Sequence, residues 1–224
     1  MAAESRALQA LYQRLRDFYG HQRWWPGETP FEVIIGAILT QNTAWTNVEK
    51  AITALKRAEA LTPRKMKELP LRKLAALIRP SGYYNVKARR IKSFIQFLFK
   101  TFDGNLNNMF STETGVLRGL LLGVSGIGPE TADSILLYAG NKPVFVVDAY
   151  TRRIFGRLGF LDGTETYGDI QDFFMKCLPE DVPLYNDYHA QIVALGKNVC
   201  RPKPRCGLCP VRNNACNMDA KRVR

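Results

Sequence analysis

Four cysteines close to the C-terminus are the residues whose type and spacing point most directly to chemistry. They follow the pattern C-x5-C-x2-C-x6-C, and the fifth cysteine, Cys177, stands apart as an expected buried thiol. Since we expect a cytoplasmic protein, where disulfides are rare, closely spaced thiols predict a metal site. Zinc sites usually pair two tight C-x2-C motifs and one is present here, so zinc stays open but a [4Fe–4S] cluster, which tolerates longer loops, is favoured. The four candidate ligands are Cys200, Cys206, Cys209 and Cys216.

An acidic residue ends the apolar run 144–147 (VFVV). Asp148 is therefore expected close to a hydrophobic core, where a carboxylate is costly unless it is partnered or functional. We treat Asp148 as a candidate catalytic group.

A glycine-rich turn precedes this acid. Gly126 and Gly128 flank Ile127, and Pro129 is suited to the first turn of a following helix. Without side chains on either side, the backbone N–H groups of such a hairpin can approach a phosphate, and the helix N-terminus adds partial positive charge. By itself, a glycine-bracketed turn between two core helices is more often only a turn. The hairpin is thus a candidate anion cradle whose role depends on the rest of the chain.

The charge balance favours a polyanionic partner. The chain has 224 residues, a formal net charge of +12 and a pI near 9.7, with Lys and Arg spread along it. The alternative is an ordinary basic protein without such a partner. A hydrophobic content of 46% is enough for a sizeable core in one large domain or two small lobes. No secretory signal opens the chain and no apolar run is long enough to span a bilayer, so we expect a cytoplasmic monomer without a membrane partner.

Apolar residues recur with helical spacing along the chain and no convincing strand is found, so the expected fold class is all-α. The stretch that begins at Pro30 is apolar nearly all round and is expected to be a buried helix with Thr29 as its N-cap. Residues 104–109 are expected to be a loop. The expected helices are 7–19, 30–39, 42–60, 62–68, 70–78, 85–102, 130–139, 150–160, 167–178 and 184–199.

The hairpin and the acid together resemble the helix-hairpin-helix DNA glycosylases of the endonuclease III superfamily. In that family a G-x-G hairpin holds the DNA backbone, and the acid of a V-D-x-[YHT] motif sits at the reacting sugar. Here the motifs are Gly126-Ile127-Gly128 and 147–150 (VDAY). The resemblance covers roughly residues 24–217. It implies a nucleoid-associated enzyme that acts on double-stranded DNA containing a damaged base, with Asp148 as the catalytic residue.

The cysteine spacing is similar to the family's cluster loop, C-x6-C-x2-C-x5-C, with one residue moved from the first gap to the last. The resemblance therefore implies that the four cysteines hold a [4Fe–4S] cluster. Because Arg and Lys interleave with them, the cluster is expected to fix a basic loop against DNA phosphate, with Lys203 and Arg205 as contacting residues.

Two further stretches resemble DNA-contacting turns of the family. In the stretch 40–43 (TQNT), the resemblance implies that Gln41, with Asn42 beside it, fills the gap left by a flipped nucleotide; the alternative is a helix C-cap with an exposed amide. The stretch 81–88 (SGYYNVKA) resembles the G-[LY]-Y-x-x-K-A turn that enters the duplex beside the lesion. Tyr83 would be the wedge, and the alternative is a core tyrosine.

The resemblance also implies two helical lobes with a DNA-binding cleft between them. A six-helix lobe would span residues 24–142 and carry the hairpin at 123–129. The second lobe would combine residues 1–23 and 143–224 around a cluster loop at 200–216.

The residue that decides the expected reaction is Glu130. Bifunctional members of the family carry a nucleophilic lysine at that position, two residues after the second hairpin glycine. Without the amine no Schiff base with C1′ can form there, so we expect a monofunctional glycosylase without significant lyase activity. Asp148 would position or deprotonate a water and stabilise the cationic sugar, and Glu130 would favour a leaving base that is already cationic.

The segment Trp24-Trp25-Pro26 bears on the substrate. Two adjacent tryptophans cannot share one face of a regular element, so they could plug the interface between lobes or offer a stacking surface to a flipped base. With the motifs at 39–43 and 128–133, the segment looks like the 3-methyladenine DNA glycosylase III branch. This implies alkylated purines as substrates and a base pocket that also includes Glu130.

Two alternatives stay open. Some members of that branch lack the cluster cysteines, which leaves room for an endonuclease III-like enzyme acting on another lesion such as oxidised pyrimidines. A non-catalytic DNA-binding protein is the alternative from another class. An unpaired acid at Asp148 would count against it.

Overall fold

The structure is a computed structural model that describes residues 2–212 and 216. Every regular element within them is helical and no strand is formed there, which confirms the all-α prediction. None of the described helices combines the length and the apolar character that crossing a bilayer requires.

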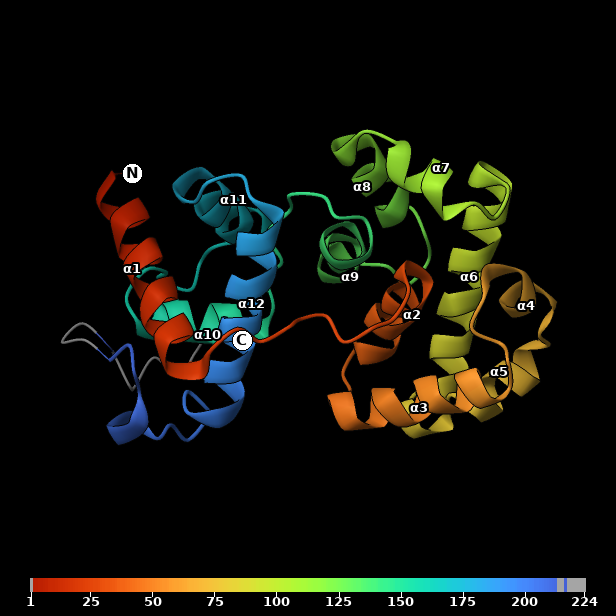
Figure 1. Ribbon diagram of the computed structural model, residues 1–224, viewed down its shortest axis with the longest axis horizontal. Helices are drawn as coiled ribbons and strands as arrows, with labels where there is room; N and C mark the ends of the chain where they lie inside the picture. The colour runs from red at the N-terminus through yellow and green to blue at the C-terminus, as the bar shows by residue number, and fades with distance from the viewer. Residues whose placement is uncertain (1, 213–215, 217–224) are drawn as a thin grey trace. The chain divides into compact units, whose positions relative to one another are not determined.

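The chain divides into two compact units (Figure 1). Residues Met1–Trp24 and Pro143–Arg224 form one, here named the terminal unit, and Trp25–Lys142 form the other, the central unit. The first helix therefore shares a unit with the C-terminal part of the chain.

A buried helix organises the central unit. All residues of α2 (Pro30–Thr40) from Phe31 to Leu39 are buried, and α2 contacts four other elements of its unit. Thr29 is the N-cap of this helix, and its hydroxyl accepts a hydrogen bond from the Glu32 N–H at 3.1 Å. Pro30 takes the first helical position. The other elements are α3 (Trp45–Arg57), α4 (Pro63–Glu68), α5 (Leu71–Leu77), η1 (Arg79–Ser81), α6 (Tyr84–Phe102), α7 (Leu106–Ser111), α8 (Thr114–Leu122), α9 (Pro129–Ser134) and the π-helical η2 (Ile135–Ala139).

The loop predicted at 104–109 is wrong, because α7 begins inside it. The side-chain oxygen of Asn105 accepts hydrogen bonds from the N–H groups of Asn107 at 2.8 Å and Asn108 at 3.2 Å. An asparagine in this position caps a helix, and Met109 in the new helix is fully buried. The polar residues that looked like a loop are a helix start.

The terminal unit is built around α12 (Val182–Asn198), which is buried along most of its length and packs on α1 (Ala2–Tyr19) and α10 (Ala149–Arg157). Phe145 stacks on Phe174 of α11 (Tyr167–Cys177) with ring centroids 4.1 Å apart, beside the buried ring of Tyr188. A single 3-10 turn, η3 (Cys206–Leu208), follows α12.

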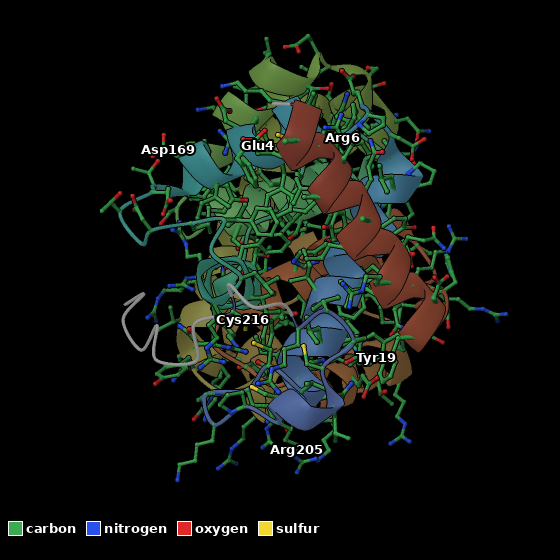
Figure 2. All side chains as sticks on the ribbon, turned by 90° about the vertical axis from the view of Figure 1, so that its left-hand side faces the viewer. Glu4, Arg6, Tyr19, Asp169, Arg205 and Cys216 are labelled. Carbon is green, nitrogen blue, oxygen red and sulfur yellow. The ribbon has the colours of Figure 1, made fainter. Side chains whose placement is uncertain are left out.

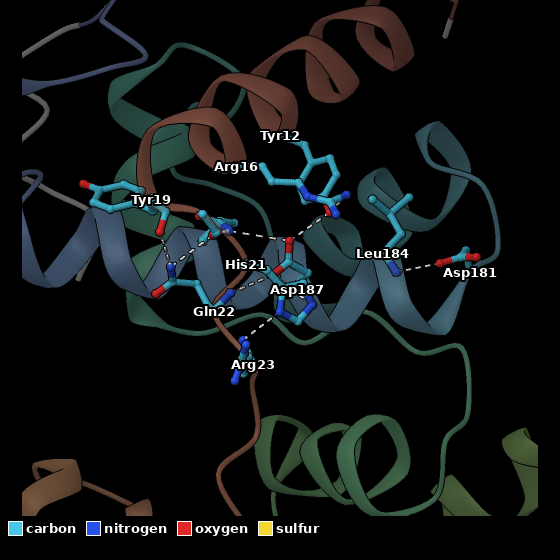
Figure 3. A network of polar contacts seen from close by, with 11 residues as sticks. Tyr12, Arg16, Tyr19, His21, Gln22, Arg23, Asp181, Leu184 and Asp187 are labelled. Carbon is cyan, nitrogen blue, oxygen red and sulfur yellow. Dashed lines mark hydrogen bonds and ion pairs between the residues drawn. The ribbon is translucent and has the colours of Figure 1, made fainter.

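A buried carboxylate ties the end of α1 to α12 (Figure 3). Asp187 accepts hydrogen bonds from the Tyr12 hydroxyl at 2.9 Å and from the Gln22 N–H at 3.2 Å. His21 Nε2 lies 3.8 Å from the same carboxylate. Both oxygens of Asp187 are therefore occupied by neighbours that belong to the fold of the terminal unit.

Candidate functional site

Asp148 is the N-cap of α10. Its Oδ1 accepts hydrogen bonds from the Thr151 N–H at 2.7 Å and from the Thr151 hydroxyl at 2.9 Å, and the hydroxyl in turn accepts from the Asp148 N–H, which forms a capping box. The view of Asp148 as an unpaired acid is therefore wrong, because Thr151 in the first turn of α10 hydrogen-bonds to it. The cap holds one carboxylate oxygen and fixes the direction of the other.

His189, on α12, is the residue toward which that second oxygen points. Its Nε2 lies 3.6 Å from Asp148 Oδ2, and the two side chains are 6% and 12% exposed. Burial alone raises the pKa of Asp148, but the neighbouring His189, together with the hydrogen bonds from Thr151, outweighs it and holds the pKa below its ordinary value. Asp148 is therefore a carboxylate at neutral pH, able to stabilise positive charge or to accept a proton.

Sequence reasoning missed His189. The chain has two histidines, and nothing in the spacing relates position 189 to position 148. The packing of α12 against α10 brings them together.

The two glycines of the hairpin differ in how strictly their backbone conformation and surroundings require a glycine. Gly126 has φ +87°, and an added Cβ would overlap Cγ of Arg90, so both the backbone conformation and the packing need a glycine. Gly128 has φ −94°, and an added Cβ would meet nothing within 4 Å. Ile127 between them is buried and its N–H donates to the Val124 carbonyl at 3.0 Å. The open side of the hairpin is thus at Gly128, where an external group can approach the backbone.

Gln41 lies against this hairpin. It is the C-cap of α2, and its amide nitrogen donates to the Gly126 carbonyl at 3.0 Å and to the Thr131 hydroxyl at 2.9 Å. Arg90 donates to the oxygen of the same amide. The next residue, Asn42, is exposed in the left-handed backbone region, with φ 51°. The structure therefore joins the TQNT turn to the hairpin.

Tyr83 is 73% exposed and also left-handed, with φ 44°, at the start of α6. A core position for its side chain is thereby excluded. The turn that carries it is tied to the TQNT turn by buried Lys87, whose ammonium donates to the Thr43 hydroxyl at 2.7 Å and to the Ser81 carbonyl at 2.7 Å. Burial, and next the charge of Arg90, lower the pKa of Lys87 to about 8.

The adjacent tryptophans belong to different units. Trp25 packs with its ring centroid 5.1 Å from those of Trp45 and Tyr138, and with Pro26 and Trp45 it lines a pocket of about 140 Å³ in the central unit. Trp24 is half-buried in the terminal unit, with the Lys197 ammonium 6.0 Å from its ring. Sequence reasoning missed Trp45 and Tyr138, since an aromatic residue inside a helix is ordinarily a core residue.

Glu130 belongs to the central unit. It lies in the first turn of α9, two residues after Gly128, and is exposed. Asp148 belongs to the terminal unit.

The four cysteines of the predicted cluster are all half-buried. Burial, and then the charges of neighbouring cysteines, raise the pKa of Cys209 and of Cys216. Arg157 donates to the sulfur of Cys200 at 3.3 Å. Among the described residues no group of three or more acidic, histidine or cysteine side chains is arranged as a metal site, and 213–215 of the predicted loop lie outside them.

The donor set nevertheless fits an iron–sulfur cluster, because it consists of thiols beside a buried guanidinium that can offset their charge. Two arginines of α10 anchor the loop: Arg153 donates to the Cys200 carbonyl at 2.9 Å and Arg157 to the Arg201 carbonyl at 2.7 Å. Lys203 and Arg205 are exposed, and Arg205 lies at the margin of the view in Figure 2.

Comparison with known proteins identifies relatives over most of the chain. The family model described as HhH-GPD superfamily base excision DNA repair protein matches residues 35–180. A putative DNA repair glycosylase of Methanocaldococcus jannaschii is 48% identical over 207 residues, which cover 92% of this chain and 94% of that protein. Endonuclease III of Thermotoga maritima is 31% identical over 186 residues, covering 83% of this chain and 82% of that protein.

Solved structures agree. The 3-methyladenine DNA glycosylase MagIII of H. pylori bound to 1,N6-ethenoadenine has a TM-score of 0.75 and 33% identity, covering 87% of this chain and 97% of that one. A trapped covalent complex of endonuclease III with DNA has a TM-score of 0.79 and 23% identity, covering 92% and 93%; it shows the shared fold.

Proposed function

The chain belongs to the HhH-GPD superfamily of base-excision DNA repair proteins, and on that premise we propose that it is a monofunctional DNA glycosylase for alkylated purines such as 3-methyladenine. The observation that carries the proposal is the carboxylate of Asp148, whose side chain is 12% exposed and which is held ionised and capped through one oxygen only. Its second oxygen is directed by His189 and can serve the reacting sugar.

The reaction is hydrolysis of the N-glycosidic bond. The bond between C1′ and the base nitrogen breaks, its electron pair leaves with the base, and positive charge develops on the sugar. Asp148 stabilises that charge and accepts or orients the proton of the water that attacks C1′. A 3-methylated adenine carries a positive charge before it leaves, so it departs as a neutral base and needs little acid assistance.

Glu130 supports hydrolysis without strand cleavage. It offers a carboxylate where a lysine amine would be needed to form a Schiff base with C1′. A second negative charge near the base also favours a cationic over an anionic leaving group. A monofunctional enzyme with a preference for alkylated purines accounts for both properties.

The aromatic side chains support a base pocket. Trp25, Pro26 and Trp45 line one pocket of the central unit, and Trp24, which directly precedes Trp25 in the chain, belongs to the terminal unit. Stacking a cationic purine on such rings contributes about 1–2 kcal/mol when the contact is desolvated. A relative at 33% identity is bound to 1,N6-ethenoadenine, a modified purine, which agrees with this substrate class.

We assign DNA positioning to the joined turns of the central unit. The N–H groups at Gly126 and Gly128 would hold a backbone phosphate on the open side of the hairpin. Gln41 and Asn42 would fill the gap left by the flipped nucleotide, and Tyr83 would enter the duplex beside it.

In the terminal unit, Cys200, Cys206, Cys209 and Cys216 would hold a [4Fe–4S] cluster, which when bound would supply a rigid anchor for the surrounding loop. Arg153 and Arg157 hold the start of that loop. Lys203 and Arg205 would then present their charges to phosphate.

A second candidate is an endonuclease III-like glycosylase that acts on oxidised pyrimidines. The 31% identity with Thermotoga maritima endonuclease III over 83% of the chain favours it. It shares the DNA contacts and Asp148 with the first candidate and differs in the lesion.

The two candidates are separated by measuring base release. Purified protein is incubated with duplex DNA treated with a methylating agent, and with oligonucleotide duplexes carrying ethenoadenine or an oxidised pyrimidine. Released bases are identified by chromatography, and strand breaks are counted with and without alkali. We expect release of 3-methyladenine with breaks that appear only after alkali. Release of oxidised pyrimidines alone would favour the second candidate, and release of no base would indicate a DNA-binding protein without glycosylase activity.

A further inference from the structure

The charged residues that line one groove of the central unit are all arginines. It lies between α5, η1 and the start of α6, has a volume of about 580 Å³, and contains Arg72, Arg79 and Arg89, with Tyr84 and Asn85 beside them. All three arginines are exposed, and none of the three guanidinium groups makes a hydrogen bond or ion pair with any residue that the structure describes. Three like charges thus surround one hollow without a partner.

Other pockets of the same unit are balanced. One contains Glu49 beside Lys50 and Arg57. In another, Arg64 lies 3.5 Å from Glu68. In a third, the Lys56 ammonium is 2.9 Å from Glu28 and 3.0 Å from Glu32. The groove with three arginines differs because no carboxylate lines it. The repulsion between its three guanidinium groups is offset only when an anion binds.

The groove lies beside the turns that we assign to DNA. Consecutive side chains on a helix project about 100° apart, so Arg89 lines the groove while Arg90 packs on the hairpin at Gly126. Tyr83, 73% exposed, directly precedes Tyr84 at the edge of the groove. The hairpin contact of Arg90, the exposed Tyr83 and the groove therefore all involve the first turns of α6, which packs on α5 (Figure 1).

We propose that Arg72, Arg79 and Arg89 form a second phosphate-binding site, which holds consecutive backbone phosphates of duplex DNA next to the hairpin contact. Guanidinium groups bind phosphate oxygens through paired N–H donors, and each strand of a duplex presents a regular row of such oxygens. The site carries no base-specific group, so it contributes affinity and register without sequence preference. This inference rests on the proposed binding of DNA but not on any particular lesion.

The test is the salt dependence of binding to an undamaged duplex. Fluorescence anisotropy of a labelled oligonucleotide is measured for wild type and for the triple variant Arg72→Gln, Arg79→Gln, Arg89→Gln between 50 and 200 mM KCl. Three lost phosphate contacts should lower the slope of log K against log salt by about 2.7, so wild type should lose about 40-fold more affinity than the variant over this range. A triple Arg→Lys variant should keep most of the slope, because the charges remain.

A matched control removes the same net charge elsewhere. The triple variant Lys50→Gln, Arg57→Gln, Arg64→Gln changes three exposed cations of the same unit outside the groove. Its slope should stay close to that of wild type. Equal slopes for the groove variant and the control, or no DNA binding by wild type, would overturn the inference. A lowered slope in the groove variant together with no release of 3-methyladenine would uphold this site while refuting the proposed substrate.

Discussion

Two acids of the terminal unit, Asp187 and Asp148, each lie beside one of the two histidines, and they are used differently. Asp187 has both oxygens occupied: Oδ1 accepts from the Gln22 N–H, and Oδ2 accepts from the Tyr12 hydroxyl at 2.9 Å and from the Gln191 amide at 3.5 Å. Asp148 has its Oδ1 taken by Thr151, while Oδ2 faces His189 at 3.6 Å, longer than a good hydrogen bond.

The difference teaches how to separate a structural acid from a reactive one in this fold. An acid whose lone pairs are all used by the protein stabilises the protein, and Asp187 joins α1 to α12 in this way. An acid that is oriented by a cap, kept ionised, and left with one oxygen for an incoming group can act on a ligand. Asp148 meets that description and Asp187 does not.

The largest expected effect comes from Asp148→Asn. Asparagine caps a helix about as well as aspartate, so the fold should be kept while the charge is lost. We expect lesion binding to persist and single-turnover release of 3-methyladenine to fall by about 10²–10⁴, as for the loss of a positioned base or charge stabiliser. Full release by this variant would place the chemistry elsewhere.

The reverse pattern is expected for Asp187→Ala. Without the carboxylate, the Tyr12 hydroxyl and the Gln22 N–H lose a buried acceptor, which should lower the free energy of unfolding by about 1–3 kcal/mol. Urea denaturation measures this loss. Base release per folded molecule should stay near that of wild type, and a drop as large as that of Asp148→Asn would remove the distinction between the two acids.

A smaller effect separates the two roles of Asp148 itself. Asp148→Ala loses the cap on α10 as well as the charge, so its free energy of unfolding should lie about 0.5–2 kcal/mol below that of Asp148→Asn. Both variants should be equally poor in base release. Equal stability of the two would show that the Thr151 hydrogen bonds contribute little to the helix.

The smallest effect at neutral pH is expected for His189→Gln. Asp148 keeps its Thr151 hydrogen bonds and stays ionised there, but it loses the partner that does most to lower its pKa. A lowered carboxylate pKa contributes stability that is present above the unfolded value of 3.8 and is lost as the pH falls through the folded value. In the variant the folded pKa of Asp148 should be higher. The loss of stability and the fall in the rate of base release on acidification should therefore both begin at a higher pH. An unchanged onset of that fall in rate would mean that His189 does not act on Asp148.

Local signals in the sequence account for much of the fold. Thr29 with Pro30 marks the start of α2, and the apolar period from residue 31 to 39 marks its burial. The turn at Gly126 is predictable from the sequence because only glycine adopts its φ without strain. The start of α7 was missed because an asparagine cap and a polar loop have the same composition, and only the hydrogen bonds at Asn105 tell them apart.

The partners of the candidate site were harder to find. His189 is far from Asp148 in the chain, and only the packing of α12 on α10 makes them neighbours. Trp45 and Tyr138 contact Trp25 from two different elements. A period within one helix carries no information about such contacts, because they depend on tertiary packing.

The central claim, hydrolysis without a covalent enzyme–sugar intermediate, is tested most directly by borohydride trapping. Wild type and Glu130→Lys are incubated with the same lesion-containing duplex and reductant, and protein–DNA adducts are separated by denaturing electrophoresis. We predict base release without an adduct for wild type, and some adduct for Glu130→Lys, where an amine follows the hairpin. A trapped adduct with wild-type protein would contradict the monofunctional mechanism and point to another lysine, such as Lys142, as the nucleophile.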